Sequence, residues 1–308
     1  MHALHAMVLT LNEEIHLTRC LESIKGVCTS ITVIDSGSTD RTVEIAKNFG
    51  VEVITNPFVN HSAQTAFAIE HLRCRGGWLL RIDADEYLCE GAAEGLAKLL
   101  GNLPDDVDGV YLRLRRVFMG RWLKHGGLYP LWLLRVWRNG HGRCEPKWMD
   151  EYISVEGKIH YEPLDFADHT LRPLIWWSTK HVDYATREAI DLLLKEDGKH
   201  DIQRRPGLKY WIKNNVYNSM PSGLRSFGYF LWRYVVGLGF LDGKAGYYFH
   251  ALQGLWYRTL VDAITDEIRR NVADGATLED AIARQTGRRI AIASACEVKL
   301  PSQNPDSR

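Results

Sequence analysis

A largely apolar stretch from Trp78 to Ile82 ends in the acids Asp83, Asp85 and Glu86. Such a stretch is typical of a buried parallel strand, and open α/β sheets bind their ligands beyond the carboxyl ends of these strands. Asp83 and Asp85 are two residues apart, so on a continuing strand their side chains share a face. Neighbouring carboxylates repel each other unless a cation joins them, and Mg²⁺ or Mn²⁺ bridging a diphosphate is a suitable cation. The alternative is a solvated acidic turn, because Asp-x-Asp alone is a common pattern.

Asp35 also follows an apolar run, at residues 31–34, and could accept a hydrogen bond from a base or a ribose. The residues after it, Ser36-Gly37-Ser38-Thr39-Asp40, form a small polar loop. Turn and cap chemistry is therefore the alternative for both Asp35 and Asp40.

A second acidic pair, Asp150 and Glu151, stands between apolar and aromatic residues. Partial burial raises the pKa of a carboxyl group towards the range in which a general base works. The alternative is a helix start with Asp150 as its N-cap.

Alternating strand and helix patterns place Asp35, Asp83 and Asp85 at one edge of a sheet. Strands are expected at residues 3–9, 31–34, 51–55 and 78–82. Helices are expected at residues 13–23, 41–49 and 62–73, the first with Asn12 as its cap. Short connections between repeated strand–helix units imply a parallel, Rossmann-like α/β sheet. The chain has no Gly-x-Gly-x-x-Gly or Walker loop, which excludes the standard dinucleotide and P-loop sites.

The middle of the chain has a different pattern. Residues 110–115 and part of 131–137 alternate, which predicts strands of a mixed sheet. The basic, glycine-bearing loop at 120–127 could hold an anionic ligand or be a solvated hairpin. His169, beside Asp168, could be a ligand or an orienting group. Residues 174–195 are expected to be helical.

Residues 204–258 carry eight Lys or Arg residues, one acid (Asp242) and 14 of the 32 aromatic residues of the chain. Basic stretches rich in Trp and Tyr that are too short to span a bilayer suit helices lying in the headgroup layer. A buried helical subdomain is an equally good interpretation. Nucleic acid is not expected as a partner, because the known RNA-reading signatures are missing.

Size and composition narrow the class of protein. A chain of 308 residues with 38 basic and 38 acidic side chains has room for a full core, and its net charge names no partner. Its six cysteines are scattered, without a Cys-x-x-Cys pair, which fits a reducing compartment rather than a zinc site or a disulfide framework. Residues 1–11 do not look like a signal peptide, and no run reaches the roughly 18 apolar residues of a spanning helix. We expect a cytoplasmic protein, peripheral on the inner face of the membrane.

Taken together, these residues resemble the inverting family 2 glycosyltransferases with a GT-A fold. The matching pieces, in the expected order, are Thr10-Leu11-Asn12-Glu13-Glu14, the loop from Asp35 to Thr42, Asp83-Ala84-Asp85-Glu86, and Met149-Asp150-Glu151. The later stretch, with Lys180-His181 and residues 239–243, is similar to a bacterial subgroup that builds lipopolysaccharide core, capsule or exopolysaccharide of the colanic-acid type. The resemblance implies a GT-A catalytic domain over 1–170, a helical region over 171–295 that serves the acceptor or the membrane surface, and a disordered tail over 296–308.

The resemblance also implies the residues that bind the donor, a nucleoside-diphosphate sugar. Asp35 would bind the nucleobase, and the nucleotide pocket would be lined by Thr10, Asn12 and Glu14. The family often has an Asn shortly before an aromatic residue in the helix after the third strand, where this chain has Gln64-Thr65-Ala66-Phe67.

For the reaction, the resemblance implies a divalent ion and a base. Asp83 would contact ribose or metal, and Asp85 would coordinate Mg²⁺ or Mn²⁺ on the diphosphate. Asp150 would be the catalytic base of a single displacement onto a saccharide or lipid-linked acceptor. Because Met149 replaces the Glu that precedes this Asp in the family, Glu151 is a rival base.

Two other functions remain open. A polyprenyl-phosphate glycosyltransferase would use the same sheet with a lipid phosphate as acceptor. A non-catalytic sugar-nucleotide-binding protein would keep the pocket and need no acid at 150. A nucleotidyltransferase is not expected, because its Gly-rich basic loop after the first strand is absent.

Overall fold

The computed structural model describes residues 3–145, 152–196 and 223–287. The chain divides into two compact units, one made of residues 1–177 and 227–255 and the other of residues 178–226 and 256–308. The predicted bases Asp150 and Glu151 and the expected tail at 296–308 lie outside the described residues. Within the described ranges, no helix is both long and apolar enough to cross a membrane.

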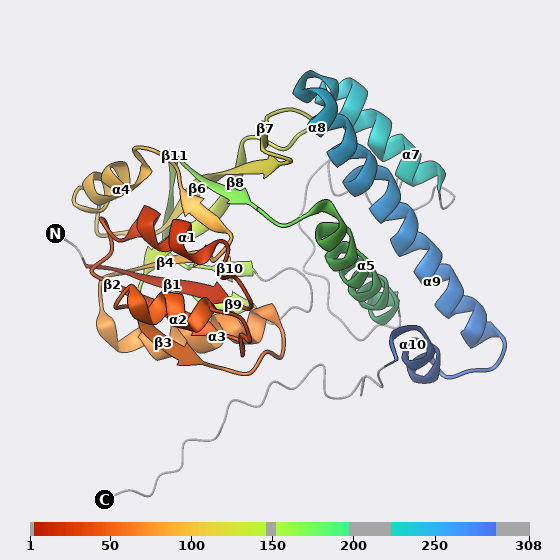
Figure 1. Cartoon of the computed structure of the whole chain (residues 1–308), viewed down its shortest axis with the longest axis horizontal. Helices are drawn as coiled ribbons and strands as arrows, with labels where there is room; N and C mark the ends of the chain where they lie inside the picture. Colours follow the sequence, from red (N-terminus) through yellow and green to blue (C-terminus); the bar gives the residue numbers. More distant parts are fainter. Residues whose placement is uncertain (1–2, 146–151, 197–222, 288–308) are drawn as a thin grey trace, which may run out of the picture. The chain divides into compact units, whose positions relative to one another are not determined.

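The first unit is built on a mixed sheet with strand order β3-β2-β1-β4-β8-β6-β11-β5, and β7 pairs with β6 (Figure 1). Strands β1 to β4 are parallel, as the strand–helix alternation predicted. Their bounds are β1 (Leu4–Thr10), β2 (Ser30–Asp35), β3 (Glu52–Thr55) and β4 (Trp78–Asp83). Every residue of β1 is buried, which fits a central strand covered on both faces.

β8 makes the sheet mixed, because it runs antiparallel to both β4 and β6. β11 then pairs in parallel with β6 and antiparallel with β5. The strands expected at 110–115 and 131–137 are confirmed. The bounds are β5 (Glu86–Leu88), β6 (Val107–Phe118), β7 (Arg121–Leu123), β8 (Leu131–Arg138) and β11 (Lys158–His169), with a separate ribbon of β9 (Arg143–Glu145) and β10 (Tyr152–Ser154). The expected α/β class with a mixed sheet flanked by helices is therefore confirmed.

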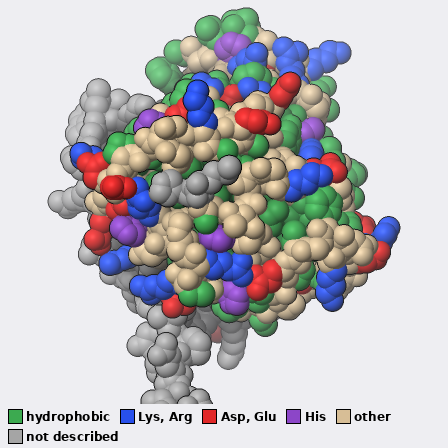
Figure 2. Space-filling view, turned by 90° about the vertical axis from the view of Figure 1, so that its left-hand side faces the viewer, with side chains coloured by type: hydrophobic (Ala, Val, Ile, Leu, Met, Phe, Trp, Pro, Cys, Tyr) green, Lys and Arg blue, Asp and Glu red, His purple; other side chains and the backbone are tan. Residues whose placement is uncertain are grey.

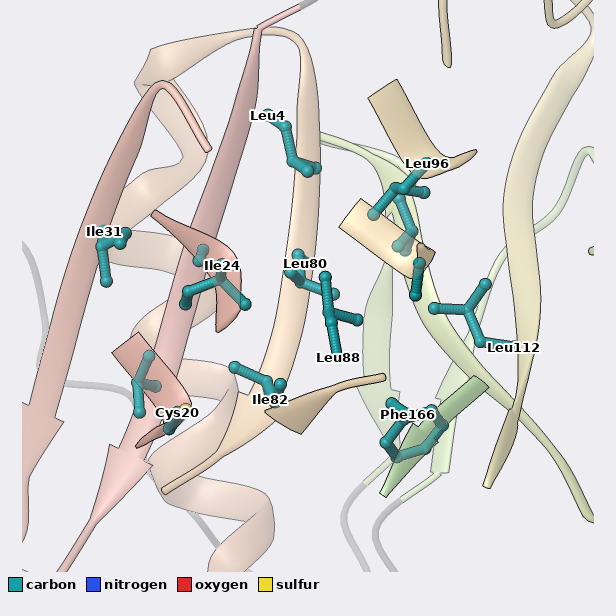
Figure 3. Packing of buried hydrophobic residues seen from close by; sticks show 14 of the residues in the cluster. Leu4, Cys20, Ile24, Ile31, Leu80, Ile82, Leu88, Leu96, Leu112 and Phe166 are labelled. Atoms are coloured by element: carbon teal, nitrogen blue, oxygen red, sulfur yellow. The ribbon is translucent and has the colours of Figure 1, made fainter. Parts of the chain in front are cut away.

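Helices cover the two faces of the sheet with separate cores. On one face, α1 (Leu17–Ile24), α2 (Thr42–Asn48) and α4 (Ala92–Leu100) pack on alternate residues of β1, β4 and β6. Figure 3 shows part of this core, with Ile24 from α1, Leu80 from β4 and Leu96 from α4. On the other face, α3 (His61–Leu72), which continues into η1 (Arg73–Arg75), packs on Met7, Leu79 and Trp137.

The helix expected to start at Glu13 begins at Leu17, so the prediction that Asn12 caps it is wrong. Asn12 has a φ of 56°, and its side-chain oxygen accepts a hydrogen bond from the backbone N–H of Thr39 at 2.7 Å. The side-chain amide of Asn12 thus joins the loop after β1 to the loop after β2. Residues 13–16 form a turn in which the His16 ring contacts the Glu13 carboxylate.

Residues 227–255, which begin within α7 (Leu224–Leu231), belong to the first unit. The chain after α7 forms η3 (Trp232–Val236), η4 (Gly239–Asp242), α8 (Gly243–Phe249) and η5 (His250–Trp256). This stretch is hydrogen-bonded to the 120–127 loop. The buried carboxylate of Asp242 accepts hydrogen bonds from the backbone N–H groups of Lys124 and His125 at 3.0 and 2.9 Å, and Gly126 donates to the carbonyl of Gly237 at 2.7 Å.

The described part of the second unit is helical, as the fold class predicted, and the helix expected at 174–195 is confirmed. Its helices are α5 (Leu174–Glu196), α9 (Tyr257–Ala273) and α10 (Leu278–Thr286). Aliphatic residues of all three, among them Ile190, Ile264 and Ile282, form one core. The buried carboxylate of Asp262 is paired with Arg225, and Glu188 accepts hydrogen bonds from Tyr257 and Arg258 at 2.6 and 2.5 Å.

Candidate active site

The carboxyl ends of β1, β2 and β4 meet at one edge of the sheet. Thr10 at the end of β1 is in register with Asp35 at the end of β2, and Leu9 is in register with Asp83 at the end of β4. Asp35 and Asp83 therefore lie on either side of β1, at the shared sheet edge that the strand pattern predicted. Thr10 is 5% exposed, and its hydroxyl has no hydrogen-bond partner among the described residues. That hydroxyl is thus, in the part of the chain that the structure describes, a buried polar group without a partner at this edge.

Asp35 organises the loop that follows it. One carboxylate oxygen accepts hydrogen bonds from the backbone N–H groups of Gly37 and Ser38 at 3.0 and 2.9 Å, and the other accepts from the Ser38 hydroxyl at 2.5 Å. The side chain is 2% exposed. These bonds form the turn that was the alternative reading of this acid. A ligand would add only one further donor to a carboxylate that already accepts three hydrogen bonds from the protein.

The loops after β1 and β2 are joined by reciprocal hydrogen bonds. Asn12 donates its backbone N–H to the Ser38 hydroxyl at 2.8 Å while its side chain accepts from Thr39. Glu14 accepts from the backbone N–H of Arg41 and donates its own N–H to Asp40, both at 3.2 Å. Asn12 and Glu14 thus hold the two loops in one arrangement.

Asp40 organises the turn that leads into α2. One of its carboxylate oxygens accepts hydrogen bonds from the backbone N–H of Thr42 at 2.9 Å and from the Thr42 hydroxyl at 2.5 Å. Burial would raise the pKa of Asp40, but these hydrogen bonds outweigh it and lower the pKa. The observed contacts of Asp40 are therefore those of a turn, together with the hydrogen bond from Glu14.

Asp83 presents a partly exposed carboxylate at the end of β4. Its side chain is 34% exposed, and Nη2 of Arg81 lies 3.4 Å from Oδ1. Burial alone would raise the pKa of Asp83, but the positive charges of Arg81 and Arg135 outweigh it and lower the pKa. Asp83 is therefore ionised at neutral pH and suited to a cation or to hydroxyl donors.

The turn that carries Asp85 is held from several sides. Its carbonyl accepts hydrogen bonds from Nη2 of Arg19 and from the backbone N–H of His169, both at 3.2 Å. Arg19 also contacts the ring of His169 at 3.1 Å and lies over the ring of Tyr87. His169 thus holds the turn through its backbone N–H. Sequence reasoning did not single out Arg19, which lies on α1, 66 residues away in the chain.

Glu86 is the buried member of the acidic motif. It accepts from the backbone N–H of Asp83 at 2.9 Å, and Arg135 lies 2.5 Å from its other oxygen. Burial, with a smaller contribution from the charges of Asp83 and Asp85, raises the pKa of Glu86 to about 8 despite Arg135. Glu86 therefore stabilises the turn after β4 through buried contacts with Asp83 and Arg135. The motif alone did not reveal this role.

The acidic edge can be compared with the needs of Mg²⁺ or Mn²⁺. Asp83 and Asp85 offer hard oxygen donors, which these ions prefer. Within the described ranges, no group of three or more His, Cys, Asp or Glu residues is arranged to hold a metal ion. Mg²⁺ commonly takes only one or two carboxylates and fills its remaining positions with phosphate oxygens and water. Asp83 and Asp85 supply the one or two carboxylates that such an ion commonly takes.

Parts of the chain are similar to known proteins. The family model of Glycosyl transferase family 2 matches residues 6–152. The lipopolysaccharide core biosynthesis glycosyltransferase LpsC of Rhizobium meliloti is 29% identical over 184 residues, which cover 55% of this chain and 67% of that protein. An uncharacterized glycosyltransferase of Rickettsia typhi is 38% identical over 90 residues, and the match covers only 30% of its length.

Among solved structures, glucosyl-3-phosphoglycerate synthase from Mycobacterium tuberculosis, in complex with Mn²⁺, uridine diphosphate and glucosyl-3-phosphoglycerate, is similar at 17% identity and a TM-score of 0.43. That match covers 65% of this chain and 81% of the other. The acidic edge lies wholly within the part of the chain that the family model matches. Residues 6–152 are thus a glycosyl transferase family 2 domain.

Proposed function

We propose that the chain transfers a sugar from a nucleoside-diphosphate sugar to a saccharide or lipid-linked acceptor in the synthesis of lipopolysaccharide core. The observation that carries this proposal is the acidic edge formed by Asp35 and Asp83 on either side of β1 within a family 2 domain. The similarity to LpsC supports lipopolysaccharide core as the product.

In this proposal, different residues of the acidic edge bind different parts of the donor. Thr10, Asn12, Glu14 and Asp35 line the nucleotide pocket. Asp83 and Asp85 face the diphosphate end and would hold Mg²⁺ or Mn²⁺. A divalent ion bound there supplies positive charge against the diphosphate that leaves. Arg19 and His169 position the turn of Asp85 through its backbone carbonyl.

The transfer is a single displacement. Asp150 accepts the proton of the acceptor hydroxyl as its oxygen forms a bond to the anomeric carbon. The bond from that carbon to the diphosphate oxygen breaks, and the configuration at the carbon inverts. Glu151 is the rival base. Both residues lie outside the described ranges, so their assignment rests on the family motif.

A donor screen tests the proposal. Consumption of a panel of nucleotide sugars is measured with and without Mn²⁺ for the unmodified chain, Asp150→Asn, Glu151→Gln and the control Asp105→Asn, whose side chain is fully exposed. Removing the base should lower turnover by roughly 10²- to 10⁴-fold while donor binding is preserved. Full activity of Asp150→Asn with loss in Glu151→Gln would transfer the role to Glu151. Donor binding without any turnover would indicate the non-catalytic alternative, and transfer to polyprenyl phosphate would indicate the lipid-phosphate alternative.

We also propose that the first unit contacts the membrane through residues 227–248. Ten large apolar side chains in this segment are each 40–64% exposed: Phe227, Leu231, Trp232, Val235, Val236, Leu238, Phe240, Leu241, Tyr247 and Tyr248. The only acid among these residues, Asp242, is buried, whereas Arg121 and Lys124 beside it are exposed. Hydrophobic and basic side chains gather at the top of the space-filling view (Figure 2). This combination suits an anionic lipid surface.

Sedimentation with vesicles of neutral lipid, with and without anionic lipid, tests the membrane contact. Trp232→Ser should weaken binding by about tenfold or more, since burying a large apolar side chain contributes roughly 1.5–3 kcal/mol. Val59→Ser, at an exposed apolar residue outside the segment, is the matched control. Equal binding of both variants would refute the contact.

A further inference from the structure

The face of the sheet that carries Asp83 continues across β8, β6 and β11. On β4, Leu79, Arg81 and Asp83 alternate with core residues of the opposite face. Leu79 is in register with Trp137 of β8, and Leu134, further along β8, is in register with Tyr111 of β6. Because cross-strand partners share a face, the odd-numbered residues of β6 from Tyr111 onwards lie on the face of Asp83.

Aromatic rings gather on this continuous face. Tyr111 and Tyr161, which are register partners, stack with centroids 4.9 Å apart, and Trp132 meets Tyr161 edge-on at 5.4 Å. Tyr161 is 56% exposed, and Trp132 is partly exposed. Exposed ring faces carry partial negative charge, which suits the C–H face of a pyranose ring. We call Tyr111, Trp132 and Tyr161 the aromatic cluster.

Two arginines with a surplus of positive charge lie next to the aromatic cluster. Arg113 and Arg115 both bind the buried carboxylate of Asp165, through contacts of 2.8 Å from each Nε, and Tyr129 donates to the same carboxylate at 2.9 Å. Two guanidinium groups and one carboxylate leave one positive charge unbalanced. Nη1 of both arginines has no hydrogen-bond partner among the described residues, and their side chains are 26% and 34% exposed.

This face lies close to the acidic edge that carries Asp83. β8 separates β4 from β6, and neighbouring strands lie about 4.8 Å apart, so β6 lies about 10 Å from β4. The arginines are near the carboxyl half of β6, which runs in the direction of β4 because β8 is antiparallel to both. A molecule on this face can therefore reach towards Asp83 across the sheet.

We propose that this face binds the acceptor of the transfer proposed above, and that the acceptor is an acidic saccharide. A sugar ring stacks on the exposed ring of Tyr161, next to Trp132, and its carboxylate or phosphate group is bound by Arg113 and Arg115. Charge complementarity selects an anionic saccharide over a neutral one, since the arginine pair retains its surplus charge after binding Asp165.

Ligand-observed NMR titrations with glucose 6-phosphate, glucuronic acid and glucose test this proposal. Either acidic sugar should bind at least fivefold more tightly than glucose, and the comparison of the two shows whether phosphate or carboxylate is preferred. Arg115→Gln should remove this preference, and Tyr161→Ala should weaken all binding by about fivefold or more. Arg116→Gln is the matched control, because Arg116 follows Arg115 on the strand, points to the opposite face and pairs with Asp168.

Binding of uridine diphosphate with Mn²⁺, measured on the same samples, shows that each variant is folded and separates the two proposals. Unchanged nucleotide binding together with weakened acidic-sugar binding supports the acceptor face. Equal binding of glucose and the acidic sugars, or no effect of Arg115→Gln and Tyr161→Ala, would overturn it, even when donor turnover is normal. Absence of donor turnover with the expected sugar binding would instead overturn the transfer function.

Discussion

Gly126 lies where the 120–127 loop meets the segment 227–255, and its substitution tests whether this close approach fixes the loop. Its φ is +69°, a conformation that costs a residue with a Cβ atom roughly 1–2 kcal/mol. A Cβ at this position would also lie under 3.0 Å from Cε1 and Nε2 of His250 and 3.1 Å from the carbonyl oxygen of Arg233. His250 is fully buried, so its ring cannot move aside into solvent.

The neighbouring Gly127 separates the two contributions. Its φ is +72°, and a Cβ there would meet no atom within 4 Å. Gly127→Ala should therefore cost only the roughly 1–2 kcal/mol of the left-handed backbone. Gly126→Ala should cost about 1–3 kcal/mol more, which is the usual range for forcing extra volume into a packed site.

Native-state hydrogen exchange measures this difference locally. The reporter is the backbone N–H of Gly126, which donates to the carbonyl of Gly237 at 2.7 Å. The free energy of opening at this amide and its neighbours should fall further in Gly126→Ala than in Gly127→Ala. The double variant with His250→Ala should recover part of the loss, because the obstructing ring is removed. Equal effects of the two glycine substitutions, within about 0.5 kcal/mol, would refute the reasoning.

Three further outcomes are expected. Burial, with a contribution from Arg233, lowers the pKa of His250 to about 4, below the roughly 6.5 of an unfolded chain. The stability linked to His250 is therefore complete above about pH 6.5. It is lost as the pH falls towards 4, by about 2 kcal/mol at pH 5. Hydrogen exchange of residues 227–255 should show this dependence of stability on pH, and His250→Leu should abolish it. Asp35→Asn should cost roughly 1–3 kcal/mol, because the Ser38 hydroxyl and two N–H groups lose their ionised acceptor, and a urea titration with a parallel measurement of uridine diphosphate binding checks this. Arg19→Gln should weaken Mn²⁺-dependent nucleotide binding about tenfold by freeing the Asp85 carbonyl, whereas Arg73→Gln, at a largely exposed side chain, should leave it unchanged in calorimetry.

The acidic edge was predictable because local sequence patterns decide it. An apolar run that ends in Asp83 specifies both a buried strand and the edge at which its acid lies, and the same logic applies to Asp35. The wrong prediction that Asn12 caps a helix also came from a local pattern. A polar residue before a helical pattern usually caps the helix. The side-chain amide oxygen of Asn12 instead accepts a hydrogen bond from Thr39, which lies 27 residues away and outside any local pattern.

The sequence by itself determined the order of strands and helices, the parallel half of the sheet and the acids at its edge, because apolar periodicity and turn chemistry act over a few residues. Only the tertiary structure decided the contacts that join distant stretches. Asp242 holds the 120–127 loop from 117 and 118 residues away, and Arg19 reaches the turn of Asp85. Tyr161 comes beside Tyr111 and Trp132 only because β11 pairs with β6 and β6 with β8. Strand pairing is set by the packing of the whole sheet, and no single stretch of chain encodes it.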